Sequence, residues 1–143
     1  MTATIDSNIL IYASNESDPL HERAADLVHH LARGPEIMYL FWPTIMGYLR
    51  IVTHPAVLPH PASPTAAAQN IADILSLPHV RTGVEEDGFW DAFQDTAGRQ
   101  ARGNDVPDAH IATLMRQHGV RTIYTRDRGF KRFPGIDAQD PFV

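Results

Sequence analysis

Two aspartates stand directly after segments that are typical of short strands. Asp6 follows residues 2–5, which are β-branched or small, and Asp127 follows residues 121–125 after one arginine. Ligand sites in open α/β sheets lie beyond the carboxyl ends of the strands, so we expect both carboxylates at one edge of a sheet. The alternative for each residue is a turn aspartate that bonds its own backbone, which is a common arrangement.

Two more aspartates lie three residues apart in GNDVPDAHIATL, where a helical pattern begins. Asp105 could be the N-cap of that helix, because an aspartate there accepts hydrogen bonds from free backbone N–H groups. Asp108 shares one helix face with Ile111 and Ala112, which follow it at three and four residues. An acid on the buried face needs a partner, and a cation held jointly with the two strand-end carboxylates would supply one.

The four aspartates would repel each other in one concavity unless protons or metal ions intervened. All-oxygen ligation suits Mg²⁺ or Mn²⁺ rather than zinc, and the chain has no cysteine for a thiolate site. Such ions activate water and stabilise the charge that develops on a phosphodiester. The residues therefore indicate metal-dependent phosphodiester hydrolysis, with one ion or a pair of ions roughly 4 Å apart.

The overall charge is acidic, which is unusual for a protein that binds nucleic acid. The 143 residues carry a formal net charge of −5, and 20% of them are charged. If the four aspartates surround a divalent cation, the rest of the chain is close to neutral, and local basic residues could hold a phosphate backbone. The composition disfavours broad non-specific binding of nucleic acid and is compatible with a nuclease.

Basic residues cluster around the last aspartate and occur once more in a central helical segment. The candidates for contacts with RNA phosphates are Arg50, Arg126, Arg128, Lys131 and Arg132. The alternative for each of them is a solvated surface charge. The histidines are not expected to be catalytic, because metal-activated water needs no such base.

Short apolar segments alternate with helical patterns along the chain. The expected strands are residues 2–5, 37–41, 78–82 and 121–125. The expected helices are residues 8–14, 19–33, 43–53, 64–76, 88–97 and 106–118, with Asp18, Ser63 and Asp87 as N-caps. This alternation is typical of an α/β fold with a mainly parallel sheet that helices cover on both faces.

The length and patterning predict one domain over residues 1–143. No charged n-region followed by an apolar h-region begins the sequence, so we expect no signal peptide. The longest uncharged run, residues 37–49, contains a proline and is shorter than the roughly 20 residues that span a bilayer. We expect its aromatic cluster, with Met46 and Tyr48, in the core, or alternatively in a dimer interface. We expect a cytoplasmic protein without membrane contact.

Three blocks of the sequence resemble one known family. They are IDSNILIYAS at residues 5–14, PDAHIATLMRQHGV at 107–120 and IYTRDRGFKRFPGI at 123–136. In order and spacing they resemble the PIN-domain family, specifically the VapC-type toxins of bacterial toxin–antitoxin pairs. The resemblance implies a three-layer α/β/α sandwich and a Mg²⁺-dependent endoribonuclease that cuts structured RNA. It also implies a cognate VapB-like antitoxin that occupies the active-site groove, and a homodimer.

The family's site residues carry over to matching positions in this sequence. Asp6, Asp108 and Asp127 match the metal-binding acids. Asn8 matches the polar residue that braces the first acid, and Thr125 matches the hydroxyl residue beside the last one. Hydrolysis at such a site would leave 5′-phosphate and 3′-hydroxyl ends.

One position departs from the family pattern. The family carries a glutamate in the helix that here reads WPTIMGYLRIVTHP, and the matching residue is Gly47. Helix propensity does not explain the change, because a glycine inside a helix costs about 1 kcal/mol relative to alanine. Three explanations remain open: Asp105 is the substitute acid, the site binds metal weakly, or the glutamate was removed deliberately. We favour the first.

The leading prediction is therefore a VapC-like ribonuclease toxin in which Asp6, Asp108 and Asp127, with Asp105, bind Mg²⁺ or Mn²⁺. The first alternative is a PIN-fold module that has lost efficient catalysis with its glutamate and acts by binding RNA or antitoxin. The second alternative is a different metal-dependent phosphohydrolase, such as a small-molecule phosphatase.

Overall fold

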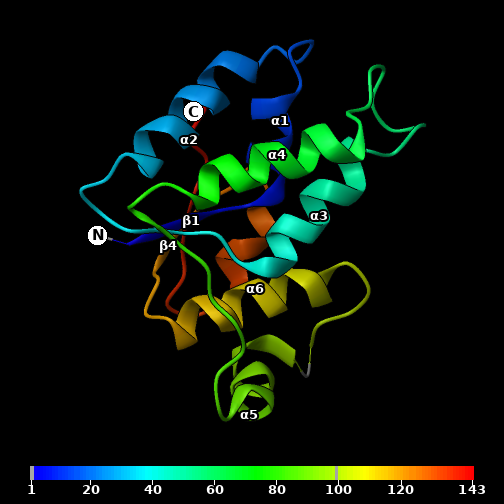
Figure 1. Cartoon of the computed structure of the whole chain (residues 1–143). Helices are drawn as coiled ribbons and strands as arrows, with labels where there is room; N and C mark the ends of the chain where they lie inside the picture. Colours follow the sequence, from blue (N-terminus) through cyan, green and yellow to red (C-terminus); the bar gives the residue numbers. More distant parts are fainter. Residues whose placement is uncertain (1, 99) are drawn as a thin grey trace.

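The computed structural model describes residues 2–98 and 100–143, and a five-stranded sheet runs through its centre (Figure 1). The strands are β1 (Ala3–Ile5), β2 (Met38–Tyr39), β3 (Val80–Arg81), β4 (Thr122–Tyr124) and β5 (Asp137–Gln139). Their order is β3-β2-β1-β4-β5, and every neighbouring pair is parallel. Because β1 is central and pairs with β4, the residues that follow these two strands meet at one edge of the sheet.

Helices connect the strands. The α-helices are α1 (Ser7–Ser14), α2 (His21–Ala32), α3 (Trp42–Val52), α4 (Pro64–Leu75), α5 (Phe89–Phe93) and α6 (Asp105–Gln117). A π-helical turn, η1 (Gln94–Gly98), continues α5, and a 3-10 helix, η2 (Arg128–Arg132), follows β4. No helix in the described part of the chain is long and apolar enough to cross a bilayer.

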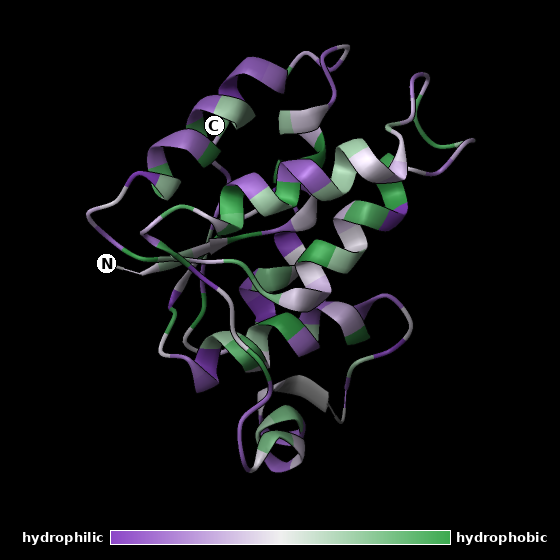
Figure 2. Ribbon diagram, in the orientation of Figure 1, coloured by the Kyte–Doolittle hydropathy of each residue, from purple (hydrophilic) through white to green (hydrophobic). Residues whose placement is uncertain are grey.

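The two faces of the sheet carry separate hydrophobic cores. One core joins β1 and β2 to α1–α4 through residues such as Ile5, Ile9 and Met38. The other joins β4 to α6 and η2 through residues such as Ile123 and Phe130. Figure 2 shows that the helices around the sheet carry both hydrophobic and hydrophilic residues along their length. The predicted three-layer α/β/α architecture with a parallel central sheet is confirmed.

Two predicted N-caps are wrong by one or two residues. Asp18 Oδ1 accepts a 2.8 Å hydrogen bond from Leu20 N, and α2 begins only at His21. Gly88, in a left-handed conformation with φ 79°, precedes α5 in place of the predicted Asp87 cap. The Ser63 cap of α4 is confirmed, since its side chain accepts from Ala66 N.

The start of α6 also differs from the prediction. Asn104 stands at the N-cap position, and Asp105 is the first helical residue. Its Oδ2 atom lies 3.5 Å from Arg102 N, so the carboxylate reaches back over the preceding turn. The prediction of Asp105 as the N-cap is therefore wrong by one position.

One strand was not predicted, and the predicted burial of one apolar cluster is only partly confirmed. Strand β5 consists of Asp137, Ala138 and Gln139, and its polar, largely exposed sequence gives no strand signal. Of the aromatic and methionine cluster, Tyr48 lies in the core, but Trp42 is 39% exposed and Met46 is 55% exposed.

Candidate active site

Asp6 is the residue on which the candidate site is centred. Its backbone N–H donates to Tyr124 O at 3.0 Å, which fixes it between the ends of β1 and β4. Its Oδ1 atom accepts from Ser7 N at 2.7 Å, so the carboxylate is also the N-cap of α1. Backbone pairing and capping together hold this acid at the carboxyl edge of the sheet, as the sequence predicts.

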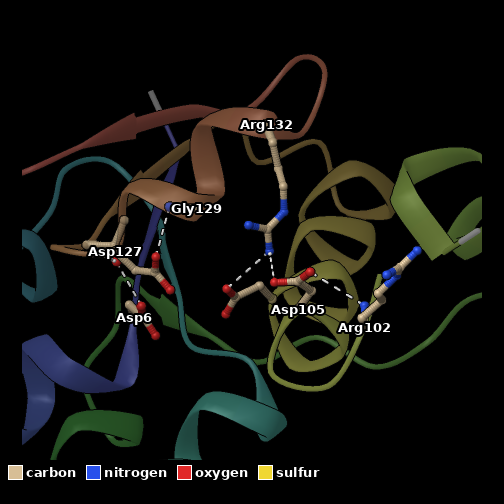
Figure 3. A network of polar contacts seen from close by, with 8 residues as sticks. Asp6, Arg102, Asp105, Asp127, Gly129 and Arg132 are labelled. Atoms are coloured by element: carbon tan, nitrogen blue, oxygen red, sulfur yellow. Dashed lines mark hydrogen bonds and ion pairs between the residues drawn. The ribbon is translucent and has the colours of Figure 1, made fainter. Parts of the chain in front are cut away.

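Thr125 links the first and the last acid of the site. Its hydroxyl donates to Asp6 Oδ2 at 2.8 Å and accepts from Asp127 N at 2.9 Å. Asp127 in turn caps η2, because its Oδ1 atom accepts from Gly129 N at 2.8 Å. Figure 3 shows Asp6 and Asp127 side by side, with Gly129 above them. The fold therefore fixes both carboxylates through neighbouring backbone and hydroxyl groups.

Asp108 reaches the same place from α6. It lies in the first turn of that helix, and its side chain is 20% exposed. Burial, the charge of Asp127, a hydrogen bond with Asp127 and the charge of Asp6 together raise the pKa of its carboxyl to about 7, and Arg132 opposes part of this shift. Burial also raises the pKa of Asp6, although hydrogen bonds from Thr125 and Ser7 oppose that shift. The three acids therefore lie close enough to repel one another.

These carboxylates have the chemistry of a site for a hard divalent cation. In residues 2–98 and 100–143, no three acidic or histidine side chains lie close enough together to hold a metal ion in their present positions. Their donor atoms are all oxygens, and their mutual repulsion is what a divalent ion would relieve. Asn8, on the first turn of α1, has a buried Oδ1 atom without a hydrogen-bond partner among the described residues. The residues present fit Mg²⁺ or Mn²⁺, and the ion itself stays a prediction.

Arg132 lies beside the acids and contacts two of them. Its Nη2 atom is 3.0 Å from Asp105 Oδ1 and 3.6 Å from Asp108 Oδ2. Figure 3 shows the guanidinium directed from η2 toward Asp105. The Asp105 carboxylate is therefore paired with an arginine in this structure. Its predicted part as the substitute for the absent glutamate stays a prediction.

Gly47 lies near the site, on the face of α3 that meets α1. A Cβ atom built on it would lie 3.6 Å from Ser7 Oγ and 3.7 Å from Ser7 Cβ, which is ordinary van der Waals contact. Close packing therefore does not require a glycine here. A longer side chain at this position would start next to the residue that follows Asp6.

A pocket of about 470 Å³ lies next to Asp127, between η2 and β5. Arg126, Arg128 and Lys131 line it, so three of the predicted phosphate contacts lie together next to an acid of the site. We call it the cationic pocket. Arg126 Nε also lies 3.7 Å from Asp140 Oδ2, which fixes one wall. Arg50 is exposed in the last turn of α3 and does not line this pocket.

Comparison with known proteins identifies the family. The PIN domain profile matches residues 3–136 of the chain. The chain belongs to the PIN-domain family. Ribonuclease VapC48 of Mycobacterium tuberculosis is 45% identical over 143 residues, which cover 99% of each chain. Ribonuclease VapC43 of the same organism is 32% identical and covers 96% of this chain and 93% of its own. The predicted resemblance to VapC-type PIN domains is thereby confirmed.

Solved PIN-domain structures show the same fold. VapBC2 from Rickettsia felis, bound to a DNA fragment from its promoter, aligns with a TM-score of 0.69 and 15% identity over 97% of this chain and 98% of its own. VapC20 of Mycobacterium tuberculosis, a toxin that cleaves the sarcin-ricin loop, aligns with a TM-score of 0.65 and 20% identity over 94% and 98%.

The sequence predicted Thr125 beside the last acid, but it did not predict the backbone groups that support Asp6 and Asp127. Ser7 and Gly129 each donate a backbone hydrogen bond to one carboxylate. The signal for Gly129 was present in the sequence, because an aspartate two residues before a glycine is typical of such a turn. The pairing of Arg132 with Asp105 spans 27 residues and has no local signal.

Proposed function

We propose that the protein is a Mg²⁺-dependent endoribonuclease and the toxin of a VapBC-type pair. The observation that carries this proposal is the convergence of Asp6, Asp108 and Asp127, whose mutual repulsion helps to raise the pKa of Asp108 to about 7. A divalent ion relieves that repulsion and suits all-oxygen ligands. The identity to ribonuclease VapC48 over nearly the whole of both chains supports the choice of RNA as substrate.

The chain's own residues divide the work of hydrolysis. Asp6, Asp108 and Asp127 would hold Mg²⁺ or Mn²⁺, and Asn8 would brace the first of them. When bound, the ion would act as a Lewis acid that activates water and offsets the charge that develops at the phosphodiester. Thr125 keeps Asp6 in place through its 2.8 Å hydrogen bond.

The basic residues hold the RNA backbone in this proposal. Arg126, Arg128 and Lys131 in the cationic pocket would bind phosphates on the Asp127 side, and Arg50 would bind a phosphate farther along α3. Attack by water on phosphorus, with departure of the 3′ oxygen, leaves 5′-phosphate and 3′-hydroxyl ends.

The proposed protein partners are an antitoxin and a second copy of the chain. Solved VapBC complexes with this fold support a VapB-like antitoxin as the partner of this chain. We also propose a homodimer, because Trp42 and Met46 expose apolar surface on α3. A cytoplasmic location is part of the proposal, as expected for a nuclease whose substrate is cellular RNA.

The decisive experiment is cleavage of total RNA by the purified protein. We expect cleavage with Mg²⁺ or Mn²⁺, loss with EDTA, and loss in Asp108→Asn. Full activity of Asp108→Asn, or activity in EDTA, would contradict the proposal. Hydrolysis of p-nitrophenyl phosphate in place of RNA would favour a phosphatase instead.

A second candidate function is a PIN-fold binding module without efficient catalysis. Gly47 favours it, because the family's glutamate is absent from α3. Calorimetric titration with Mg²⁺ separates the two functions, since a binding module needs no tight divalent site. RNA binding without metal binding or cleavage would support the module.

A further inference from the structure

A second pocket, of about 380 Å³, lies on the Asp108 side of the acids. Its polar lining comes from the π-helical turn η1, the loop after it, the start of α6 and the end of η2: Gln94, Asp95, Thr96, Gln100, Asp105 and Arg132. We call it the η1 pocket. Because Arg132 also contacts Asp108, the pocket adjoins the place where a scissile phosphate would lie.

Arg132 is held firmly at the border between the η1 pocket and the acids. Asp105 and Asp108 contact its Nη2 atom, and its guanidinium carbon lies 4.8 Å from the ring centre of Phe133. A Cβ atom on Gly129 would lie 2.6 Å from Arg132 Nη1, so the absence of a side chain there leaves room for the guanidinium. An arginine fixed in this way can present its remaining N–H groups to a phosphate.

The lining of the η1 pocket offers hydrogen-bonding groups that are free to bind a ligand. Thr96 is occupied, because its hydroxyl donates to Ala92 O and accepts from Arg116. The side chains of Gln94, Asp95 and Gln100 form no hydrogen bond or ion pair with the described residues. Two amides and a carboxylate therefore face a space next to the site without partners in that part of the chain.

The charge of the η1 pocket selects a different part of RNA from the cationic pocket. Asp105 is already paired with Arg132, so Asp95 is the unpaired charge of the η1 pocket among the described residues. Asp95 would repel a phosphate inside the pocket, whereas its oxygens accept hydrogen bonds from the N–H groups of a base. Of the four bases, guanine presents two adjacent donors, N1–H and N2–H, that match one carboxylate. The volume lies within the range of known ligand pockets and is large enough for one nucleobase.

We propose that the η1 pocket is the subsite for the base of the nucleotide next to the scissile phosphate, with guanine preferred. Asp95 binds the Watson–Crick edge of the base, and Gln94 and Gln100 provide further amide contacts. Arg132 binds the phosphate of that nucleotide, and Asp105 is the residue that positions Arg132. This inference rests on the proposed nuclease function and adds a sequence preference to it.

The test is binding of the four ribonucleoside 3′,5′-bisphosphates, which contain no phosphodiester to cleave, in the presence of Mg²⁺. Binding is followed by chemical shifts of backbone amides in the ¹⁵N-labelled full chain. We expect the guanosine compound to shift the amides of residues 94–96 and 100–102 and to bind about tenfold more tightly than the uridine compound, a difference of about 1.4 kcal/mol.

Single substitutions test the base-binding and the phosphate-binding parts of the η1 pocket separately. Asp95→Ala is expected to remove the preference for guanosine, with Asp91→Ala, one turn earlier, as the matched control. Arg132→Ala is expected to weaken all four compounds by about the same factor, roughly fivefold for a lost charge-assisted contact, with partial recovery in Arg132→Lys. Arg33→Ala, at the end of α2, is the control for a lost positive charge.

The outcomes distinguish the subsite from the nuclease proposal. If the protein binds Mg²⁺ and cleaves RNA but no bisphosphate shifts residues 94–96 or 100–102, the η1 pocket is not a base subsite while the proposed function stands. Equal affinity for all four compounds in the unaltered protein would also overturn the base preference. If neither Mg²⁺ binding nor RNA cleavage is found, the proposed function itself fails. Thermal unfolding of each variant verifies that it is folded.

Discussion

The Thr125 hydroxyl donates a 2.8 Å hydrogen bond to Asp6 Oδ2, joining residues 119 positions apart in the sequence. The same hydroxyl accepts from Asp127 N, so one side chain fixes the first and the last acid of the site. Parallel pairing of β1 with β4 makes this contact possible, because the two residues follow neighbouring strands. The site is therefore built by the sheet and tightened by one buried side chain.

Replacement of Thr125 by valine keeps the shape of the side chain and removes both hydrogen bonds. We expect Thr125→Val to lower the free energy of unfolding by about 1–3 kcal/mol, the cost of leaving buried polar groups unpaired. Mg²⁺ affinity should fall as well, because Asp6 loses its support. Denaturant unfolding and calorimetry measure the two effects. Thr113→Val is the matched control, since among the described residues the Thr113 hydroxyl bonds a single carbonyl, that of Ala109 within α6. Unchanged Mg²⁺ affinity in Thr125→Val would contradict the proposed role.

The raised pKa of Asp108 predicts how stability depends on pH. Its carboxyl has a pKa of about 7 in the folded protein against an ordinary value of 3.8, so the folded state retains a proton that the unfolded chain releases. The contribution of this carboxyl to the free energy of unfolding is complete below about pH 4 and is lost as the pH rises through about 7. In EDTA, the melting temperature should therefore decrease as the pH is raised from about 4 to about 7, and most of that decrease should be absent in Asp108→Asn.

Mg²⁺ reverses that pH dependence, because the ion competes with the proton for the same carboxylates. We expect Mg²⁺ affinity, measured by calorimetry, to rise as the pH rises through about 7. Asp26→Asn, on an exposed position of α2, is the control. A flat melting temperature in EDTA for the unaltered protein would show that Asp108 does not hold a proton at neutral pH.

The sequence was sufficient to predict the acids and their common edge. Asp6 and Asp127 follow apolar strands, and Asp108 lies on the buried face of α6, so each position is fixed by local periodicity. Strand β5 was missed because an edge strand with the sequence Asp-Ala-Gln buries little and lacks the apolar pattern on which prediction depends.

The side-chain contacts of the site could not be predicted from the sequence. Whether Asp105 capped its helix, bound an ion or paired with an arginine depended on the position of η2, which only the tertiary fold determines. Caps and Asx turns use the same residue types, so the sequence around Asp18 is equally compatible with either, and the contact with Leu20 decides for the turn.

Gly47 gives a direct test of the missing acid. Gly47→Ala should stabilise the protein by about 0.5–1 kcal/mol, because the added Cβ meets Ser7 at ordinary contact distance and glycine is unfavourable within a helix. Gly47→Glu should bind Mg²⁺ about tenfold more tightly than Gly47→Ala, since a further carboxylate would enter the site. The same variant should be less stable than Gly47→Ala in EDTA, because its charge adds to the existing repulsion. Calorimetry and denaturant unfolding of both variants measure these effects, and equal Mg²⁺ affinity would place position 47 outside the metal site.

Asp105 can be assigned to the ion or to Arg132 by comparing metal binding with RNA binding. Its carboxylate lies 3.0 Å from Arg132 Nη2, so Asp105→Ala should release the guanidinium and weaken RNA binding by roughly fivefold. Mg²⁺ affinity should stay within about twofold of the unaltered protein, because the other three acids are intact. Calorimetry with Mg²⁺ and fluorescence anisotropy with labelled RNA measure the two affinities, and Asp137→Ala at the exposed edge strand β5 is the control. A loss of Mg²⁺ affinity of about tenfold or more would instead make Asp105 the substitute for the family glutamate, as the sequence predicts.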